Sequence, residues 1–282
     1  MHRIVSTVLP LMIVGYVGAA SVDIGRGEVP LVVPASYVEN TPVPLIVLVH
    51  GYQSNGVQQE KYFKLSALAN EYGFLFAAPN GTVERGGDKN RFWNAGDICC
   101  NFQASDVNDV AYLKTLIEAV QNEYNVDPKR IFMSGHSNGG FMVHRMAYEY
   151  PETIAAIVAL NGSAPNTFTK SRPASPVSIL HIHGTLDRVN SYNGGDIYGV
   201  PYPGALAGAR AWAYYAFGSA AATVAPEKMD LDTGLAGSES SATRFANGKI
   251  EVWTIEGGGH IPAFPADFNR RVLNWLYAHP KN

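Results

Sequence analysis

The chain alternates short, mostly apolar β-rich runs with longer segments whose apolar residues recur at helical spacing. The β-rich runs occupy residues 44–49, 74–79, 130–135, 155–160, 177–184 and 249–256, and the first of them is continuously apolar, as expected for a strand covered on both faces. The helical segments occupy residues 57–72, 109–124, 138–150, 205–217 and 265–278. We expect Gly73 to end the first of these helices and Asp109 to cap the second. Because strands that alternate with helices form parallel sheets, the sequence predicts an α/β fold with helices on both faces of a mostly parallel sheet.

One long segment, residues 188–248, interrupts the alternation. It is rich in Gly, Ala, Tyr and Ser, and we interpret it as an insertion on the surface with one helix at residues 205–217. Its aromatic residues either line a cleft or pack the insertion onto the body of the protein: Tyr192, Tyr198, Tyr202, Trp212, Tyr214 and Tyr215. Since the chain has no internal repeat and no linker, residues 21–282 are predicted to form a single domain.

The first twenty residues have the composition of an export signal. A basic start is followed by an apolar run over residues 4–17 and by the small residues Gly18, Ala19 and Ala20. The run is broken by polar residues and falls short of the roughly 20 apolar residues that a spanning helix needs. We therefore predict a signal peptide over residues 1–20 and a secreted or periplasmic protein without stable membrane insertion. An uncleaved anchor and a buried first strand are the alternatives.

Charge and cysteine content narrow the range of partners. The formal net charge is -3 and the sequence contains no basic stripe, which argues against a nucleic-acid partner. The two cysteines, Cys99 and Cys100, are adjacent, so a disulfide between them would close almost no loop. The sequence leaves open whether they form this disulfide or remain free thiols, although export favours oxidation. We expect no metal site at this pair, because the remaining ligands are not within sequence reach.

The segment Gly135-His136-Ser137-Asn138-Gly139 matches the Gly-x-Ser-x-Gly pattern and lies between a predicted strand and a predicted helix. A serine at such a turn is exposed at the edge of the sheet, where a neighbouring imidazole can activate its hydroxyl. Gly135 and Gly139 occupy the two positions where a side chain would crowd the turn. We therefore predict that Ser137 is a nucleophile.

A serine nucleophile of this kind requires an acid and a histidine, in that order, after later strands. Asp187 follows the strand at residues 177–184, and His260 follows the strand at residues 249–256. We predict that these residues complete a catalytic triad with Ser137. The alternative role for Asp187 is that of a turn aspartate that bonds its own backbone.

Other acids and histidines fit this role less well. Asp196, Asp230 and Asp232 lie inside the insertion, away from any strand end. His181 and His183 form a His-x-His pair without an evident third metal ligand, so we expect both to be buried or hydrogen-bonded. His136 is expected to point away from the nucleophile and to be structural.

An oxyanion forms on the substrate during acyl transfer and needs backbone donors near Ser137. The N–H of Asn138 is one candidate, because it follows the nucleophile at the start of a helix. The N–H of Tyr52 is the other, since Gly51 would allow the backbone of this loop to approach closely. An ordinary exit from a strand into a turn is the alternative explanation for residues 50–51.

Six motifs together resemble exported α/β-hydrolases of the polyhydroxybutyrate depolymerase and feruloyl esterase group. They read VPLIVLVHGYQSNG, FWNAGDICC, DVNDVAYLKTLI, IFMSGHSNGGFMVHRMA, LHIHGTLDRV and IEGGGH. The resemblance implies the α/β-hydrolase fold, no cofactor and an acyl-enzyme mechanism on carboxylic esters. It also implies that Trp93 and the Cys99-Cys100 loop lie near the mouth of the active site, where Trp93 either stacks on substrate or fills the loop.

The sequence departs from this group in ways that affect the substrate more than the triad. HIPAFP stands where the group often has Trp-Pro-Gly after the histidine, a cysteine pair common in the insertion is missing, and Asn108-Asp109 replaces paired aspartates. We predict a secreted monomeric serine esterase that acts on small or polymeric esters of feruloyl or hydroxyalkanoate type. A peptidase or another acyl transferase is the alternative within enzymes, and a non-catalytic binding protein is the alternative outside them.

Overall fold

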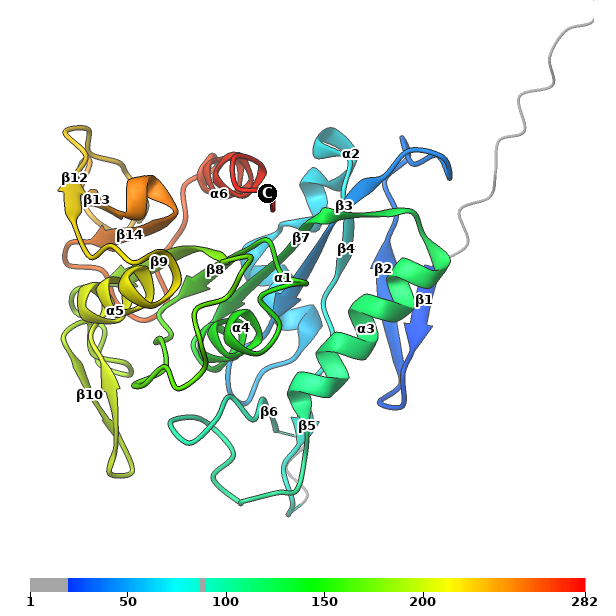
Figure 1. The fold of residues 1–282 in the computed structure, drawn as a ribbon, viewed down its shortest axis with the longest axis horizontal. Coiled ribbons are helices and arrows are strands. Elements are labelled where there is room, and N and C mark those ends of the chain that lie inside the picture. Colours follow the sequence, from blue (N-terminus) through cyan, green and yellow to red (C-terminus); the bar gives the residue numbers. More distant parts are fainter. Residues whose placement is uncertain (1–19, 87–89, 282) are drawn as a thin grey trace, which may run out of the picture.

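The computed structural model describes residues 20–86 and 90–281, so the predicted signal peptide lies outside the described residues except for Ala20. Over these residues, ten strands form one sheet in the order β1-β2-β4-β3-β7-β8-β9-β14-β13-β12 (Figure 1). In chain order, their bounds are Ala20–Asp23 (β1), Glu28–Val32 (β2), Val43–Val49 (β3), Leu75–Ala77 (β4), Val126–His136 (β7), Ala156–Leu160 (β8), Ser178–Gly184 (β9), Ala222–Val224 (β12), Ser240–Phe245 (β13) and Ile250–Ile255 (β14). Two short hairpins lie apart from the sheet: β5 (Thr82–Val83) with β6 (Arg91–Phe92), and β10 (Gly194–Ile197) with β11 (Val200–Pro203).

The six central strands are parallel, and antiparallel strands flank them on both sides. Strands β4, β3, β7, β8, β9 and β14 pair in parallel. Strands β3, β8, β9 and β14 are buried along their whole length. The six predicted strands are therefore confirmed, and their burial reflects helices packed on both faces.

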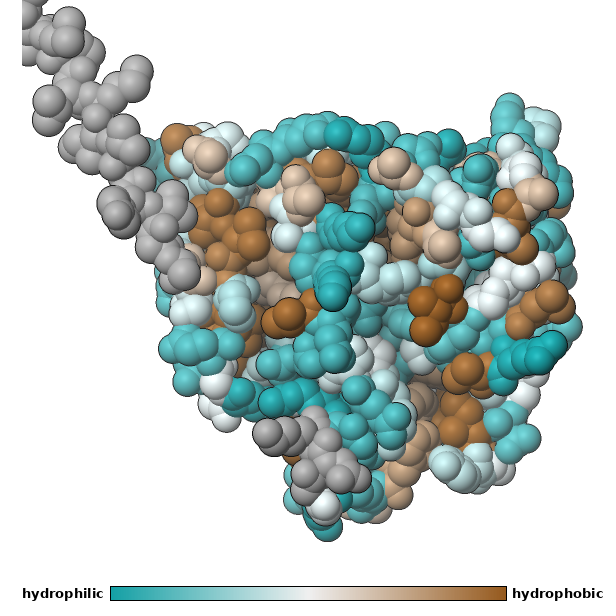
Figure 2. Space-filling model, turned by 180° about the vertical axis from the view of Figure 1, so that it is seen from behind, coloured by the Kyte–Doolittle hydropathy of each residue, from teal (hydrophilic) through white to brown (hydrophobic). Residues whose placement is uncertain are grey.

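Helices cover both faces of the sheet (Figure 1). One apolar core contains Leu113 of α3 (Asp109–Glu123), Met142 of α4 (Asn138–Glu149) and Trp212 of α5 (Ala205–Phe217). The second core contains residues of α1 (Gly56–Phe63), α2 (Ala69–Tyr72) and α6 (Phe268–Tyr277). Among the described residues, no helix has both the length and the apolar character needed to cross a membrane. On the face opposite to Figure 1, apolar residues are interspersed with polar ones (Figure 2).

The prediction of one helix over residues 57–72 is wrong. Helix α1 ends at Lys64, whose φ of 59° is left-handed, and a short turn at Ser66–Leu68 precedes α2. The Glu60 carboxylate accepts hydrogen bonds from the N–H and the hydroxyl of Ser66, which satisfies the backbone at the break. The predicted end of this region at Gly73 is confirmed, since Gly73 caps α2 with a φ of 69°.

The predicted cap of α3 is wrong by one residue. The side chain of Asn108 caps the helix and accepts the N–H of Ala111 at 2.9 Å. Asp109 lies in the first turn and is buried, and its carboxylate accepts hydrogen bonds from Arg26 and from the N–H of Asn94. Asp109 thereby anchors the segment after β6, which includes Trp93.

The insertion is less superficial than we expected. Strand β13 pairs antiparallel with β14 and extends the main sheet. Trp212 of α5 is only 2% exposed and belongs to the core under the helix, because the Ala-rich face of α5 allows close approach to the sheet. Tyr198, in the turn between β10 and β11, is by contrast 86% exposed.

Candidate active site

Ser137 lies on a sharp turn between β7 and α4. Its φ of 56° and ψ of -119° are unfavourable for a residue with a side chain, and its N–H donates to the carbonyl of Leu160 at 2.8 Å. A Cβ on Gly139 would lie 2.2 Å from the carbonyl oxygen of Val49, and one on Gly135 would lie 2.2 Å from that of Gly139. The two glycines therefore permit the turn that places Ser137 at the N-terminus of α4.

Asp187 and His260 lie after β9 and β14 and form a direct hydrogen bond. The Oδ2 atom of Asp187 accepts from His260 Nδ1 at 2.7 Å, and Oδ1 accepts the N–H groups of Val189 and Asn190. The Asp187 side chain is fully buried. Burial acts to raise the pKa of this carboxyl, but hydrogen bonds from His183 and His260 outweigh it and hold the pKa well below its usual range.

The backbone of His260 is attached to the nucleophile strand. Its carbonyl accepts hydrogen bonds from His136 Nε2 at 2.9 Å and from Asn161 Nδ2 at 2.8 Å, and the rings of His136 and His260 lie 4.9 Å apart. Within the described residues, the Ser137 hydroxyl makes no direct hydrogen bond to His260. Such bonds often tighten only when substrate binds. The structure therefore forms the Asp187–His260 pair and brings it to the same edge of the sheet as Ser137, and the catalytic roles stay a prediction.

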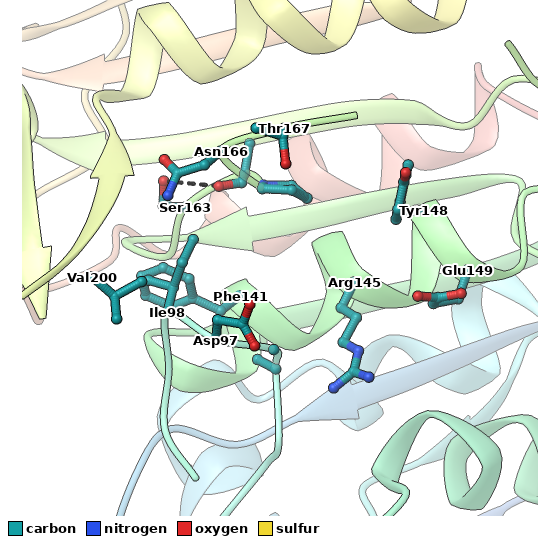
Figure 3. A pocket seen from close by; sticks show the side chains of 14 residues that line it. Asp97, Ile98, Phe141, Arg145, Tyr148, Glu149, Ser163, Asn166, Thr167 and Val200 are labelled. Atoms are coloured by element: carbon teal, nitrogen blue, oxygen red, sulfur yellow. Dashed lines mark hydrogen bonds between the residues drawn. The ribbon is translucent and has the colours of Figure 1, made fainter. Parts of the chain in front are cut away.

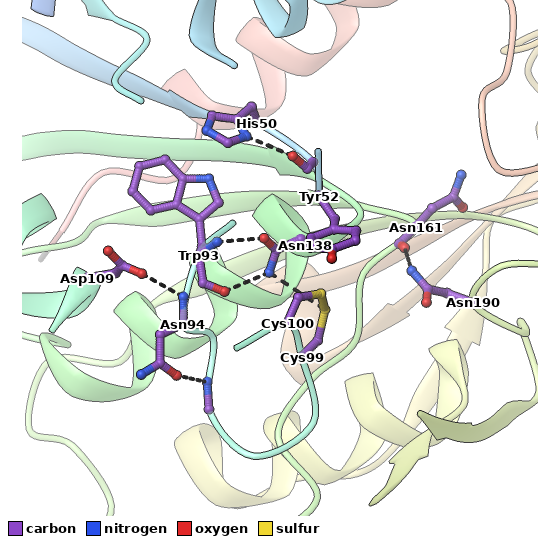
Figure 4. The surroundings of a disulfide bond; sticks show 12 residues. His50, Tyr52, Trp93, Asn94, Cys99, Cys100, Asp109, Asn138, Asn161 and Asn190 are labelled. Carbon is purple, nitrogen blue, oxygen red and sulfur yellow. Dashed lines mark hydrogen bonds between the residues drawn. A yellow bond between two sulfur atoms is a disulfide. The ribbon is translucent and has the colours of Figure 1, made fainter. Parts of the chain in front are cut away.

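Asn161 connects the loops that carry these residues. It is fully buried, its Oδ1 accepts the N–H of Gly184, and its Nδ2 donates to the carbonyls of Gly259 and His260. Its own carbonyl accepts from Asn190 Nδ2 at 2.7 Å (Figure 4). One side chain and one carbonyl thus hold the ends of β8, β9 and β14 together. Our sequence reasoning missed this residue, and the only signal was a polar residue directly after the strand at residues 155–160.

Asn161→Ala is expected to lower kcat/KM for ester hydrolysis by roughly 10- to 100-fold, because the His260 loop loses its attachment and a small misplacement of a catalytic group is costly. Steady-state kinetics with p-nitrophenyl acetate measures the loss, and circular dichroism verifies the fold. Asn122→Ala, on the exposed face of α3, is the matched control and should keep full activity. A folded Asn161→Ala protein with unchanged kinetics would refute this role.

The two predicted oxyanion donors lie beside Ser137. A Cβ on Gly51 would lie 3.5 Å from the Cβ of Ser137, so the loop that carries Tyr52 is in contact with the nucleophile. In the described part of the chain, the Tyr52 N–H has no backbone acceptor. Asn138 is the first residue of α4, where an N–H has no partner within the helix. The structure thus leaves both N–H groups without a backbone acceptor among the described residues, and their role as oxyanion donors stays a prediction.

His50 orients the loop of the first donor. Its Nδ1 donates to the carbonyl of Gly51 at 2.7 Å, and its Nε2 accepts the N–H of Gly81 at 2.9 Å. Because the Gly51 carbonyl and the Tyr52 N–H share one peptide plane, this hydrogen bond also sets the direction of that N–H. Burial lowers the pKa of His50 to about 4, which keeps the ring neutral and able to accept from Gly81.

Of the two alternatives for Trp93, the structure shows the one in which the indole fills the loop, and stacking on substrate is not supported. The indole is 0% exposed and packs against His50 and Tyr112, with ring centres at 5.0 and 6.3 Å. The side chain of Asn138 holds the backbone of Trp93, because its Nδ2 donates to the Trp93 carbonyl and its Oδ1 accepts the Trp93 backbone N–H (Figure 4). Trp93 therefore supports the loop and has no face available for stacking.

The adjacent cysteines form a disulfide, so of the two alternatives for Cys99 and Cys100 the structure shows the oxidised one (Figure 4). Both residues are buried and pack against Phe141 and Tyr202. Cys99 Sγ lies 3.6 Å from Asn138 Nδ2. The disulfide is thus an apolar element next to the start of α4.

A cavity of about 380 Å³ lies along the outer side of α4. Phe141, Arg145 and Tyr148 of α4 form one wall, and the loops around Ile98 and Ser163 form the others (Figure 3). Neither Ser137 nor His260 lines this cavity. It nevertheless begins one helical turn from the nucleophile, since the N–H of Phe141 donates to the carbonyl of Ser137.

Buried histidines near the site should make the protein unstable in mild acid. Burial lowers the pKa of His50 and His136 to about 4 and that of His144 to about 3, from an ordinary value of 6.5. Between pH 6.5 and about 4 the unfolded chain therefore binds more protons, so the free energy of unfolding falls as the pH falls. His50 alone should account for a loss on the order of 3 kcal/mol.

Urea unfolding measured at pH 7.5, 6 and 5 tests this expectation. His144→Gln should give a shallower pH dependence, because it removes one of the groups that the unfolded chain protonates. Equal unfolding free energies at pH 7.5 and 5 would contradict the expectation.

The chain is similar in sequence to several esterases. The Phospholipase/Carboxylesterase family matches residues 35–196. Feruloyl esterase B of Piromyces equi is 28% identical over 248 residues, which cover 80% of this chain and 41% of that protein. The bifunctional acetylxylan esterase/xylanase XynS20E of Neocallimastix patriciarum is 31% identical over 56% of this chain and 21% of that protein. Poly(3-hydroxyalkanoate) depolymerase C of Paucimonas lemoignei is 27% identical over 46% of this chain and 30% of that protein. The chain spans less than half the length of these curated relatives.

Solved structures share the fold at low sequence identity. An acetyl xylan esterase from Aspergillus awamori superposes with a TM-score of 0.61 and 17% identity, covering 89% of this chain and 93% of that one. A thermostable esterase superposes with a TM-score of 0.56 and 15% identity, covering 93% of this chain and 62% of that one. Together with the mostly parallel sheet, these similarities confirm the predicted α/β-hydrolase fold.

Proposed function

Because the chain belongs to the phospholipase/carboxylesterase family, we propose that it is a serine esterase that hydrolyses carboxylic esters through Ser137, His260 and Asp187. The observation that carries this proposal is the 2.7 Å hydrogen bond between Asp187 and His260, whose backbone is attached to the residue next to Ser137. That arrangement supplies an oriented base beside a serine on a strained turn.

The proposed reaction has two halves. His260 Nε2 removes the proton of Ser137, and Oγ attacks the ester carbonyl while the N–H groups of Tyr52 and Asn138 stabilise the oxyanion. His260 then gives the proton to the departing alcohol, which leaves an acyl-Ser137. A water activated by His260 releases the acid and restores the serine. Asp187 holds the imidazole in the Nδ1–H tautomer and stabilises its charged form throughout.

The relatives suggest the class of ester. They are named for feruloyl, acetylxylan and poly(3-hydroxyalkanoate) esters, so we propose an aromatic or short hydroxyalkanoate acyl group on a carbohydrate or polyester. The cavity along α4 is close enough to Ser137 to hold one part of such a substrate. Export by the segment over residues 1–20 would bring the enzyme to extracellular polymers and is consistent with a disulfide.

A panel of matched substrates tests the proposal. We expect methyl ferulate, p-nitrophenyl acetate and hydroxybutyrate oligomers to be hydrolysed, and the highest kcat/KM identifies the acyl group. An anilide with the same acyl group as the best ester distinguishes an esterase from a peptidase. Turnover of the anilide at the rate of the ester, or no turnover of any ester, would refute the proposal.

A further inference from the structure

Three histidines that the proposed mechanism does not use lie in a row behind Asp187. His144 is on α4, and His181 and His183 are on β9; each is at most 3% exposed. His144 Nε2 lies 3.4 Å from His181 Nδ1, and His181 Nε2 lies 3.0 Å from His183 Nδ1. His183 Nε2 lies 2.8 Å from the carbonyl of Asn190 and 3.5 Å from Asp187 Oδ2. The row therefore ends at the residue that holds His260.

The last acceptor sets the direction of every hydrogen bond in the row. A carbonyl accepts only, so His183 Nε2 carries the proton that faces Asn190. When all three rings are neutral, His183 Nδ1 must accept from His181 Nε2, and His181 Nδ1 must accept from His144 Nε2. His144 Nδ1 has no partner among the described residues, which makes His144 the first member. All three N–H groups then point toward Asp187.

The surroundings of His144 and His181 favour neutral rings. Burial lowers the pKa of His144 to about 3 and that of His181 well below its usual value. Trp212 packs on His144, and Tyr192 packs on His183 with its ring centre at 5.7 Å. Burial raises the pKa of Tyr192, so its hydroxyl is neutral as well. Asp187 is the charged group that the row meets, with His260 on its opposite side.

We propose that His144, His181 and His183 form a positioning unit that fixes Asn190 and Asp187 and keeps Asp187 Oδ2 directed at His260. His183 holds the carbonyl of Asn190, while the N–H of Asn190 donates to Asp187 Oδ1 at 2.9 Å. Successive hydrogen bonds in a dry interior polarise one another, so the inner two rings strengthen the donor that faces Asn190 and Asp187. The catalytic consequence rests on the proposed function of Ser137.

Stability alone does not account for this row. Three buried imidazoles, one with an unpaired nitrogen, are costly compared with apolar side chains of similar size. His181 is the informative position, because among the described residues its ring hydrogen-bonds to His144 and His183 and to no member of the proposed triad. His181→Gln keeps an amide N–H where Nε2 donates, whereas His181→Leu keeps the volume and removes the donor.

Two magnetic resonance measurements test the proposal without any enzymatic activity. In protein labelled with 15N-histidine, long-range proton–nitrogen correlations should show the Nε2–H tautomer for His144, His181 and His183 at pH 7. The low-field proton signal of the Asp187–His260 hydrogen bond should move in His181→Leu and stay near the wild-type position in His181→Gln. An Nδ1–H tautomer at His183, or a signal that is the same in both variants, would overturn the proposal.

Kinetics then tests the catalytic consequence. His181→Leu should lower kcat by roughly tenfold, the effect of one lost hydrogen bond, with KM nearly unchanged. The acid limb of its kcat/KM profile should move to lower pH, because an Asp187 Oδ2 that is less well directed at His260 stabilises the charged imidazole less. His181→Gln should restore most of the wild-type kcat and most of the wild-type pH profile. Equal kinetics in the two folded variants would contradict the positioning role, whereas a wild type without ester turnover would contradict only the proposed function.

Discussion

Ser137→Ala is expected to lower kcat/KM for ester hydrolysis by roughly 10⁵- to 10⁶-fold, the loss that removal of a triad serine typically causes. The alanine has no oxygen with which to form an acyl-enzyme. The residual rate would come from water attack on an ester that the Tyr52 and Asn138 N–H groups still polarise. Steady-state kinetics with the best ester of the panel measures the effect.

Ser134 provides a matched control for this substitution. It lies three residues earlier on β7, is fully buried, and its hydroxyl has no hydrogen-bond partner among the described residues. Ser134→Ala should therefore leave both kcat/KM and the melting temperature close to wild type. Comparable activity in Ser137→Ala and Ser134→Ala would eliminate Ser137 as the nucleophile.

Asp187→Asn is expected to lower kcat by roughly 10⁴-fold while leaving KM within a few-fold. An amide in place of the carboxylate stops holding His260 in the Nδ1–H tautomer and no longer stabilises the imidazolium that forms during the reaction. The new amide side chain would also face the groups that donate to the Asp187 carboxylate, which are the N–H groups of Val189 and Asn190 and the ring of His183. Single-turnover kinetics should show that acylation itself is slowed.

Asp196 tests the specificity of this effect. It is the rival acid nearest in sequence and is exposed on β10, where its carboxylate accepts the N–H of Gly199 at 2.9 Å. Asp196→Asn should retain full activity, and loss of activity in this variant with retention in Asp187→Asn would reverse the assignment.

Local patterns were sufficient to predict the central part of the fold and the sharp turn that carries Ser137. Strands β3 and β8 are continuous apolar runs, because helices cover both faces of the sheet. The Gly135 and Gly139 positions follow from sterics within a few residues, and the structure shows the clashes that any side chain there would make. Chain order alone placed Asp187 and His260 at the ends of β9 and β14.

Features that depend on contacts between distant segments were not predictable. The backbone of Trp93 is held by the side chain of Asn138, which lies 45 residues later in the sequence. Asn161 joins three loops only because β8, β9 and β14 lie side by side in the sheet. His144 shows no pattern in the sequence, and it becomes part of the histidine row through the packing of α4 against the sheet.

The central claim is that His260 and Asp187 activate Ser137, and labelling with a fluorophosphonate probe tests it most directly. The probe reacts with activated serines and needs no knowledge of the acyl group. Mass spectrometry of the tryptic peptide over residues 131–145 separates modification of Ser137 from that of Ser134. We predict stoichiometric labelling of Ser137 in the folded wild type, none in Ser137→Ala, and strongly slowed labelling in Asp187→Asn. A folded wild-type protein that stays unlabelled, or that is labelled at another residue, would contradict the claim.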